Sequence, residues 1–168
     1  MKNLIEDWEQ NARRKEDSTF DFLMWLKINQ DSKRVDSIAN EAHQEVFSQI
    51  DCTDCANCCK TLSPRVNQTD IERIASSLQI SEAEFIEKYL KIGDGKEYEM
   101  NALPCPFLEE NKCTIYDIRP AVCREYPHTN KEGFNHRRYQ NIGNTKICPA
   151  VYHILETMKN KFDWRDKK

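Results

Sequence analysis

The chain lacks long apolar runs. No segment approaches the roughly 18 consecutive apolar residues that a membrane-spanning helix needs. The first ten residues, MKNLIEDWEQ, hold three acidic side chains and no apolar stretch of the kind found in secretion signals. We therefore expect no membrane partner and a cytoplasmic location.

The chain also lacks an excess of positive charge. Its 25 Lys and Arg residues are outnumbered by 28 Asp and Glu, which leaves a formal net charge of −3. This balance gives no general attraction to nucleic acid, so no nucleic-acid partner is expected. Internal repeats and low-complexity segments are absent too. With 168 residues, 39% of them hydrophobic, the chain is long and apolar enough to form one domain with a single core.

Cysteine is the abundant exception, with eight residues in the chain. In a reducing compartment, cysteines at this density are more typical of metal ligands or redox groups than of a disulfide framework. Packing as small buried hydrophobes would explain one or two of them but not clustered CxxC spacings. We therefore interpret all eight as candidate metal ligands: Cys52, Cys55, Cys58, Cys59, Cys105, Cys113, Cys123 and Cys148.

Hydrophobic periodicity predicts a mostly α-helical α+β fold, with helices around a cysteine-rich core and a small β-hairpin. We expect residues 1–50 to form an N-terminal helical layer, residues 51–150 a metal-chelating region, and residues 151–168 a C-terminal helix and tail, all in one compact domain. Helices are predicted over residues 3–30, 34–50, 70–78, 82–90 and 149–162. Residues 96–103 are predicted as a strand, 106–116 as the hairpin, and 128–147 as a polar loop.

Capping signals mark the starts of two of these helices and of one further short helix. Thr69 with Glu72, and Ser81 with Glu84, have the spacing of a capping box, in which each side chain hydrogen-bonds the other residue's amide. Asp117 is expected to cap a short helix that carries Cys123. The helical pair at 70–90 holds no cysteine or histidine, so it is expected to act as scaffold or as a contact for another protein.

The densest stretch, residues 52–60, contains two overlapping CxxC units built from Cys52, Cys55 and Cys58. Each unit lets two sulfurs converge on one ion, which is how zinc sites are assembled. Three thiolates at this spacing also open the cysteine run of bacterial ferredoxins, but here Cys59 follows at once. Neighbouring side chains of an extended strand point to opposite sides, so we expect one of Cys58 and Cys59 to join the first centre and the other to serve a second centre, a bridge, or chemistry.

Charged and histidine side chains around the cysteines are candidates for supporting roles. A site of four thiolates with zinc has a net charge of −2 and needs nearby hydrogen-bond donors, for which Lys60, Arg119 and Arg124 are candidates. His128 could act as a ligand or as an acid–base group, whereas His43 is expected to be structural. The alternative for each cation is an ordinary place on the surface.

Three separated motifs together resemble the YkgJ-like cysteine-cluster family, a zinc- or iron-chelating domain with a CxxCxxCC signature. They are Cys52-x2-Cys55-x2-Cys58-Cys59, Cys105-Pro106-Phe107-Leu108, and Cys113-x-Ile115-Tyr116-x-x-Arg119-Pro120-x-x-Cys123-Arg124-x-Tyr126-Pro127. The resemblance runs from about residue 50 to 150 and implies metal binding. A similar cysteine arrangement occurs in flagellin lysine methylases. That activity is not carried over, since no nucleotide or S-adenosylmethionine fingerprint is visible.

These observations predict a protein whose clustered thiolates chelate zinc or iron, including the iron of an iron–sulfur cluster. Two alternatives stay open at this point: an enzyme that depends on iron or an iron–sulfur cluster, and an interaction adaptor stabilised by zinc. Six cysteines are the first choices as ligands, and Cys59 and Cys148 come next. The six are Cys52, Cys55, Cys58, Cys105, Cys113 and Cys123.

Overall fold

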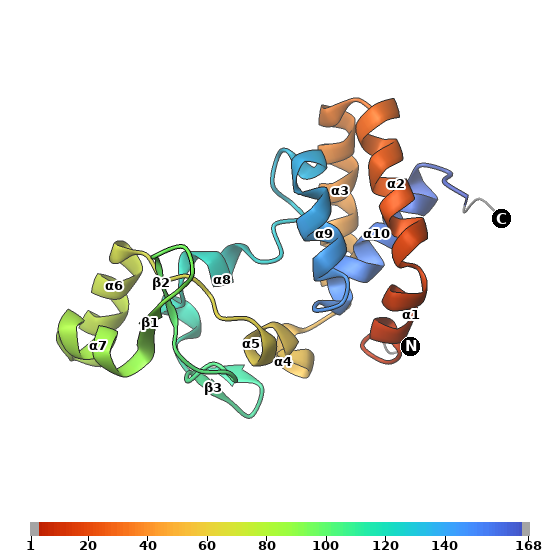
Figure 1. The fold of residues 1–168 in the computed structure, drawn as a ribbon. Helices are drawn as coiled ribbons and strands as arrows, with labels where there is room; N and C mark the ends of the chain where they lie inside the picture. The colour runs from red at the N-terminus through yellow and green to blue at the C-terminus, as the bar shows by residue number, and fades with distance from the viewer. Residues whose placement is uncertain (1–3, 166–168) are drawn as a thin grey trace. The chain divides into compact units, whose positions relative to one another are not determined.

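The computed structural model describes residues 4–165 (Figure 1). Helices dominate it, with two short antiparallel strand pairs, which confirms the predicted α+β, mostly α class. The chain forms two compact units. We call the residues up to Cys52 together with those from Pro127 onwards the helical unit, and residues 53–126 the cysteine unit. Among the described residues, no helix is both long and apolar enough to cross a membrane.

The helical unit is built around the packing of two long helices, α3 (Ser32–Phe47) and α10 (Pro149–Lys161). Their inner faces supply buried aliphatic side chains such as Val35, Ile154 and Leu155, and Phe22 of α2 (Glu16–Asn29) joins the same core. The predicted first helix is divided at Lys15 into α1 and α2. The helices are α1 (Trp8–Arg14), α2 (Glu16–Asn29), α3 (Ser32–Phe47), α9 (Arg138–Asn144) and α10 (Pro149–Lys161), with the 3-10 helix η2 (Phe134–Arg137).

The prediction of a polar loop over residues 128–147 is wrong, because η2 and α9 occupy much of it. Phe134 is fully buried and anchors the segment in the core. The Asp36 carboxylate of α3 accepts hydrogen bonds from the Gly133 and Phe134 amides, each at 2.9 Å. The polar composition was misleading since polar residues here, such as Asn141, are buried.

The cysteine unit contains short helices and two strand pairs. Strand β2 (Tyr98–Met100) lies between two neighbours. On one side β1 (Leu90–Ile92) pairs with it antiparallel, with Leu90 opposite Met100. On the other side the Val66 amide donates to the Tyr98 carbonyl at 2.8 Å. The predicted hairpin is confirmed as β3 and β4. The helix α4 (Cys52–Cys55) begins at Cys52, the last residue of the helical unit's first segment. The other elements are α5 (Asn57–Thr61), α6 (Gln68–Leu78), α7 (Glu82–Tyr89), β1 (Leu90–Ile92), β2 (Tyr98–Met100), β3 (Leu108–Glu109), β4 (Lys112–Cys113), η1 (Tyr116–Ile118) and α8 (Ala121–Glu125).

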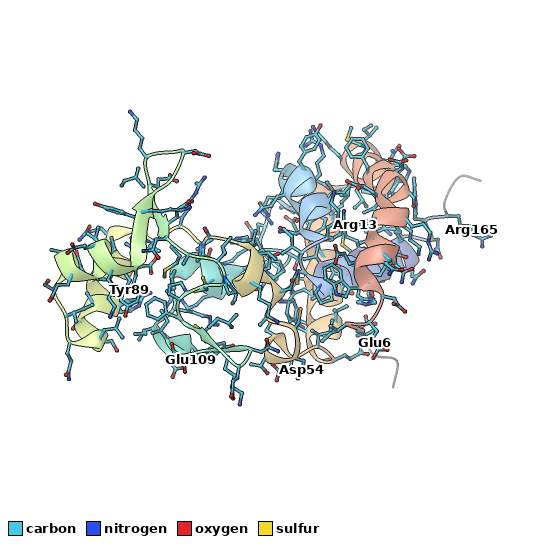
Figure 2. The ribbon with its side chains drawn as sticks, turned by 60° about the horizontal axis from the view of Figure 1, so that its bottom comes forward. Glu6, Arg13, Asp54, Tyr89, Glu109 and Arg165 are labelled. Carbon is cyan, nitrogen blue, oxygen red and sulfur yellow. The ribbon has the colours of Figure 1, made fainter. Side chains whose placement is uncertain are left out.

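A separate apolar core holds the cysteine unit together. Phe85 of α7 is fully buried, and its ring lies 6.4 Å from that of Phe107, centroid to centroid. Tyr89, labelled at the end of α7 in Figure 2, lies 4.7 Å from the same Phe107 ring. Ile71 and Ile74 of α6 complete the centre of this core. The half-buried side chains of Cys105 and Cys113 pack against this core, so its packing determines where these two candidate ligands lie.

The helix caps agree with the sequence at one position and differ at another. Ser81 and Glu84 form the predicted capping box at the start of α7. For α6 the predicted Thr69 cap is wrong: the Asn67 side chain accepts from the Asp70 amide at 2.8 Å, and the helix begins one residue before Thr69. Asparagine is among the strongest N-cap residues, which explains why the helix begins there.

Replacing Asn67 by Ala should therefore destabilise the protein by about 1 kcal/mol, because one of the first amides of α6 loses its acceptor. Thr69→Ala, inside the exposed first turn, should change stability by less than about 0.5 kcal/mol. Urea unfolding followed by circular dichroism measures both. Equal losses for the two variants, or a larger loss for Thr69→Ala, would contradict this assignment of the cap.

Candidate metal centre

Six of the eight cysteines lie in the cysteine unit. The other two, Cys52 and Cys148, belong to the helical unit. Cys52 is exposed at the start of α4. Cys148 is half-buried at the N-cap of α10, where it packs against the helical core and its amide donates to the Asn144 carbonyl at 2.8 Å. A ligand role for Cys52 or Cys148 stays a prediction.

Cys58 and Cys59 lie on the short helix α5, not on an extended strand. The helix begins after the buried Ala56, whose backbone is left-handed with φ of 50°. Successive side chains on a helix are about 100° apart, so adjacent thiols can contact each other. A hydrogen bond joins the two thiols. The expectation that they point to opposite sides therefore fails because of the local helix.

Lys60 folds back over the same turn. Its ammonium donates to the Cys55 carbonyl at 2.9 Å. The positive charge also acts on Cys59, where it lowers the thiol pKa against larger effects that raise it. Those effects are, in order, the hydrogen bond with Cys58, burial, and the Cys58 charge. Cys59 is thus a protonated thiol at neutral pH when no metal is bound.

One backbone hydrogen bond connects the N-terminal cysteine run to the distal cysteines. The Cys105 amide donates to the Cys59 carbonyl at 2.8 Å. These residues are far apart in the sequence, yet the bond fixes their Cα atoms as neighbours. The half-buried side chains of Cys59 and Cys105 consequently belong to one local environment.

Cys105 and Cys113 have the same local design. The Phe107 amide donates a hydrogen bond to the Cys105 sulfur, and the Ile115 amide donates one to the Cys113 sulfur. Phe107 and Ile115 are both about 5% exposed, so their burial in the core holds these amides in place. Hydrogen bonds of this kind favour the thiolate and lower the pKa of each cysteine, although burial, the largest effect, raises it.

The hairpin places Cys113 close to Cys105. Cys113 on β4 pairs with Leu108 on β3, and the Leu108 amide donates to the Cys105 carbonyl at 3.0 Å. Glu109, labelled in Figure 2, follows Leu108 on the exposed side of this hairpin. The predicted gathering of Cys105 and Cys113 at one end of the hairpin is therefore seen in the structure.

Cys123 enters the group from helix α8. Its amide donates to the Pro120 carbonyl at 2.9 Å. The expected cap from Asp117 is wrong, because Asp117 lies inside η1 and α8 begins only at Ala121. The Ala121 amide instead donates a hydrogen bond to the Asp70 carboxylate of α6. Burial and then the neighbouring thiols of the other three cysteines raise the pKa of Cys123 to about 12.

Four cysteines therefore form one electrostatically coupled set: Cys59, Cys105, Cys113 and Cys123. Cys59 is its common member, since it raises the pKa of each of the other three. Arg119 opposes this effect and lowers the pKa of Cys59, Cys113 and Cys123. Its guanidinium stacks 3.7 Å above the Tyr116 ring, which holds the charge near the set.

The chemistry of this set fits a soft or borderline metal ion. Thiolate ligands select zinc and iron–sulfur centres, and hydrogen bonds to sulfur with a nearby cation offset the negative charge. Between residues 4 and 165, no three Cys, His, Asp or Glu side chains already stand in an arrangement that would hold an ion. The four thiols thus fit as donors, and coordination requires their side chains to turn toward a common point.

The histidines have other surroundings. His43 shares a 2.8 Å hydrogen bond with Thr129, its ring lies against Phe47, and burial lowers its pKa, as expected for a structural residue. His153 donates to the Leu4 carbonyl at 2.8 Å. His128 has a left-handed backbone, and its carbonyl accepts from Arg137. A ligand or acid–base role for His128 stays a prediction, as does a supporting role for Arg124.

Comparison with known proteins matches residues 51–149 to a family described as "CxxCxxCC: Putative zinc- or iron-chelating domain". The chain belongs to this CxxCxxCC family. The matched range covers more than half of the chain. It contains the whole cysteine unit and all eight cysteines. Membership supports the binding of zinc or iron.

One relative of this CxxCxxCC protein is "Uncharacterized protein MJ0661" of Methanocaldococcus jannaschii, which is 33% identical over 82 residues. The alignment covers 46% of this chain and 44% of the relative, so the chain spans less than half the length of that protein. No solved structure matches the chain.

Two residues that contact the segment before Cys123 are not indicated by the sequence, Asp70 and Arg73 of α6. Asp70 is 2% exposed and binds the start of α8. Their i, i+3 spacing on a predicted helix was a signal for an ion pair, but exposed pairs of this kind are common. The sequence carries no sign that their partners lie in the segment before Cys123.

The metal-free protein should lose stability at alkaline pH. Burial and then the neighbouring thiols raise the pKa of Cys123 from 9.0 to about 12, so between these pH values the unfolded chain releases a proton that the folded chain keeps. The contribution of Cys123 is fully present below pH 9 and is lost as pH rises toward 12. Urea unfolding of reduced, chelator-treated protein at pH 8 and 10.5 measures it.

The matched control for this titration is Cys123→Ser. Serine does not ionise in this range, so the stability difference between the wild type and Cys123→Ser should shift against the wild type as pH rises. A difference that stays constant from pH 8 to 10.5 would show that the Cys123 pKa is not raised.

Proposed function

We propose that the cysteine unit chelates one zinc or iron ion through Cys59, Cys105, Cys113 and Cys123, and that this ion stabilises the fold. The supporting observation is that these four half-buried thiols, carried by α5, the β3–β4 hairpin with the residues before it, and α8, belong to one unit and act on one another's charge. The hydrogen bond from the Cys105 amide to the Cys59 carbonyl joins the segment of Cys59 to the segment that carries Cys105.

The proposal follows from charge balance. Without metal, the four thiols keep their protons, since each thiolate disfavours the next. A bound divalent cation takes the place of the protons and links segments that are distant in the sequence. Hydrogen bonds from the Phe107 and Ile115 amides then stabilise the negative sulfurs. The positive charge of the Arg119 guanidinium acts in the same direction.

Serine substitution of any one of the four should lower the bound metal strongly. Three remaining thiolates bind more weakly and leave a position open, so we expect less than about one fifth of the wild-type zinc or iron after dialysis against a competing chelator. Elemental analysis of purified protein measures this. Loss of metal should also lower the melting temperature, because binding energy is folding energy.

Cys148→Ser is the matched comparison, since Cys148 is half-buried but belongs to the helical unit. It should keep its metal under the same dialysis. Full metal content in all four variants of the proposed set would overturn the proposal. Metal loss in Cys148→Ser equal to that in the four variants would contradict a ligand set confined to those four cysteines.

A second candidate function is favoured by the surplus of thiols. Cys55 and Cys58 lie in the same unit, and Cys58 hydrogen-bonds Cys59, so more sulfurs are at hand than one ion needs. Such a surplus suits an iron–sulfur cluster, or an iron-dependent enzyme with an open coordination position. The third alternative, an adaptor that binds a protein through α6 and α7, has no observation in its favour beyond those helices themselves.

Anaerobic purification followed by iron, zinc and sulfide analysis separates the first two functions. A single-ion site should give about one metal per chain, no acid-labile sulfide and no visible absorption for zinc. A brown protein with equal amounts of iron and sulfide would instead establish the cluster. Cys58→Ser should leave the single-ion site loaded and would reduce a cluster that uses Cys58.

A further inference from the structure

We propose that Asp70, on the cysteine-free helix α6, is a positioning residue for the metal centre, because it holds the start of α8 and with it Cys123 and Arg119. This inference rests on the proposed function for its ligand set. It assigns to α6 a role in the metal site in addition to its role in the core.

The Asp70 carboxylate is buried and fully used. It is 2% exposed, and its two oxygens lie 3.1 and 3.3 Å from the Ala121 amide nitrogen. Arg73 donates to the same carboxylate at 2.6 Å. A carboxylate is costly to bury without partners, so the position of Asp70 depends on both contacts. The Ala121 amide is the first of α8, where a negative charge is also favoured by the helix dipole.

Arg73 holds the other side of the same turn. Its guanidinium donates to the Arg119 carbonyl at 3.0 Å and to the Ile118 carbonyl at 3.2 Å. Pro120, which has no N–H, lies in the chain between these carbonyls and the Ala121 amide. The turn from η1 to α8 is thus fixed by the Asp70–Arg73 pair on both sides of the proline.

The consequence reaches the ligand through a very short helix. α8 has five residues, too few to be stable alone, so outside contacts must set its position. Cys123 lies two positions after Ala121, and Arg119 lies two positions before Ala121. Because Asp70 and Arg73 neutralise each other, the pair fixes this segment without adding a net negative charge to it.

The test is the zinc affinity of Asp70→Asn, measured by competition with a chromophoric chelator at pH 7.5. Asparagine keeps the size and one acceptor oxygen but loses the ion pair with Arg73. We expect zinc binding about tenfold weaker, at the lower end of the effect of partners outside the ligand shell. Cobalt(II) bound to the variant should also show weaker thiolate-to-metal charge-transfer absorption, since Cys123 is held less well.

Ser81→Ala is the control for a purely structural effect. It removes a helix cap in the same unit, at α7, and should cost a similar amount of stability. Its zinc affinity and cobalt spectrum should match the wild type. Equal affinities in Asp70→Asn and the wild type would overturn the inference, and so would equal losses in Asp70→Asn and Ser81→Ala.

Arg73→Gln provides a second variant if Asp70→Asn does not fold. The Arg73 side chain is 30% exposed, so its replacement is tolerated more easily. It should weaken zinc binding in the same direction, and an unchanged affinity would overturn the inference. If the wild type itself binds neither zinc nor cobalt, the proposed function fails. If the wild type binds zinc and Asp70→Asn binds it equally well, only the role of Asp70 fails.

Discussion

The candidate site depends on the hydrogen bond between the Cys105 amide and the Cys59 carbonyl. It joins the helix that ends the CxxCxxCC run to the segment that carries the later cysteines. The residues after α5 are held in a related way, because the Met100 amide of β2 donates to the Pro64 carbonyl at 3.1 Å. Backbone pairing, which does not depend on side-chain identity, thus brings the thiols into one unit before any metal is considered.

The same residues serve the core and the centre. Phe107 and Ile115 are buried in the apolar core, and their amides point at the sulfurs of Cys105 and Cys113. Packing energy therefore fixes the donors that a thiolate needs. This arrangement also explains why each of these cysteines is followed two positions later by a large apolar residue.

Much of the helical framework could be predicted, because it follows from periodicity. The stripe of Val35, Ile38 and Ala39 marks α3, and Ser81 with Glu84 marks the start of α7. η2 and α9 could not be predicted in this way, since Asn141 is buried in a segment that reads as polar. The contact between the Cys58 and Cys59 thiols does not follow from the spacing of the cysteines, because it depends on the short helix α5, which a CxxCxxCC spacing does not predict. The part played by Asp70 depends on contacts more distant in the chain than any local pattern can reveal.

The register of the β3–β4 hairpin has a consequence for how the centre assembles. Cys105 and Cys113 are joined by a short loop, whereas Cys59 must close a much longer one to reach them. The entropic cost of loop closure grows with loop length, and contacts between distant residues slow folding. We therefore expect the hairpin pair to form first and Cys59 to join it in a later step.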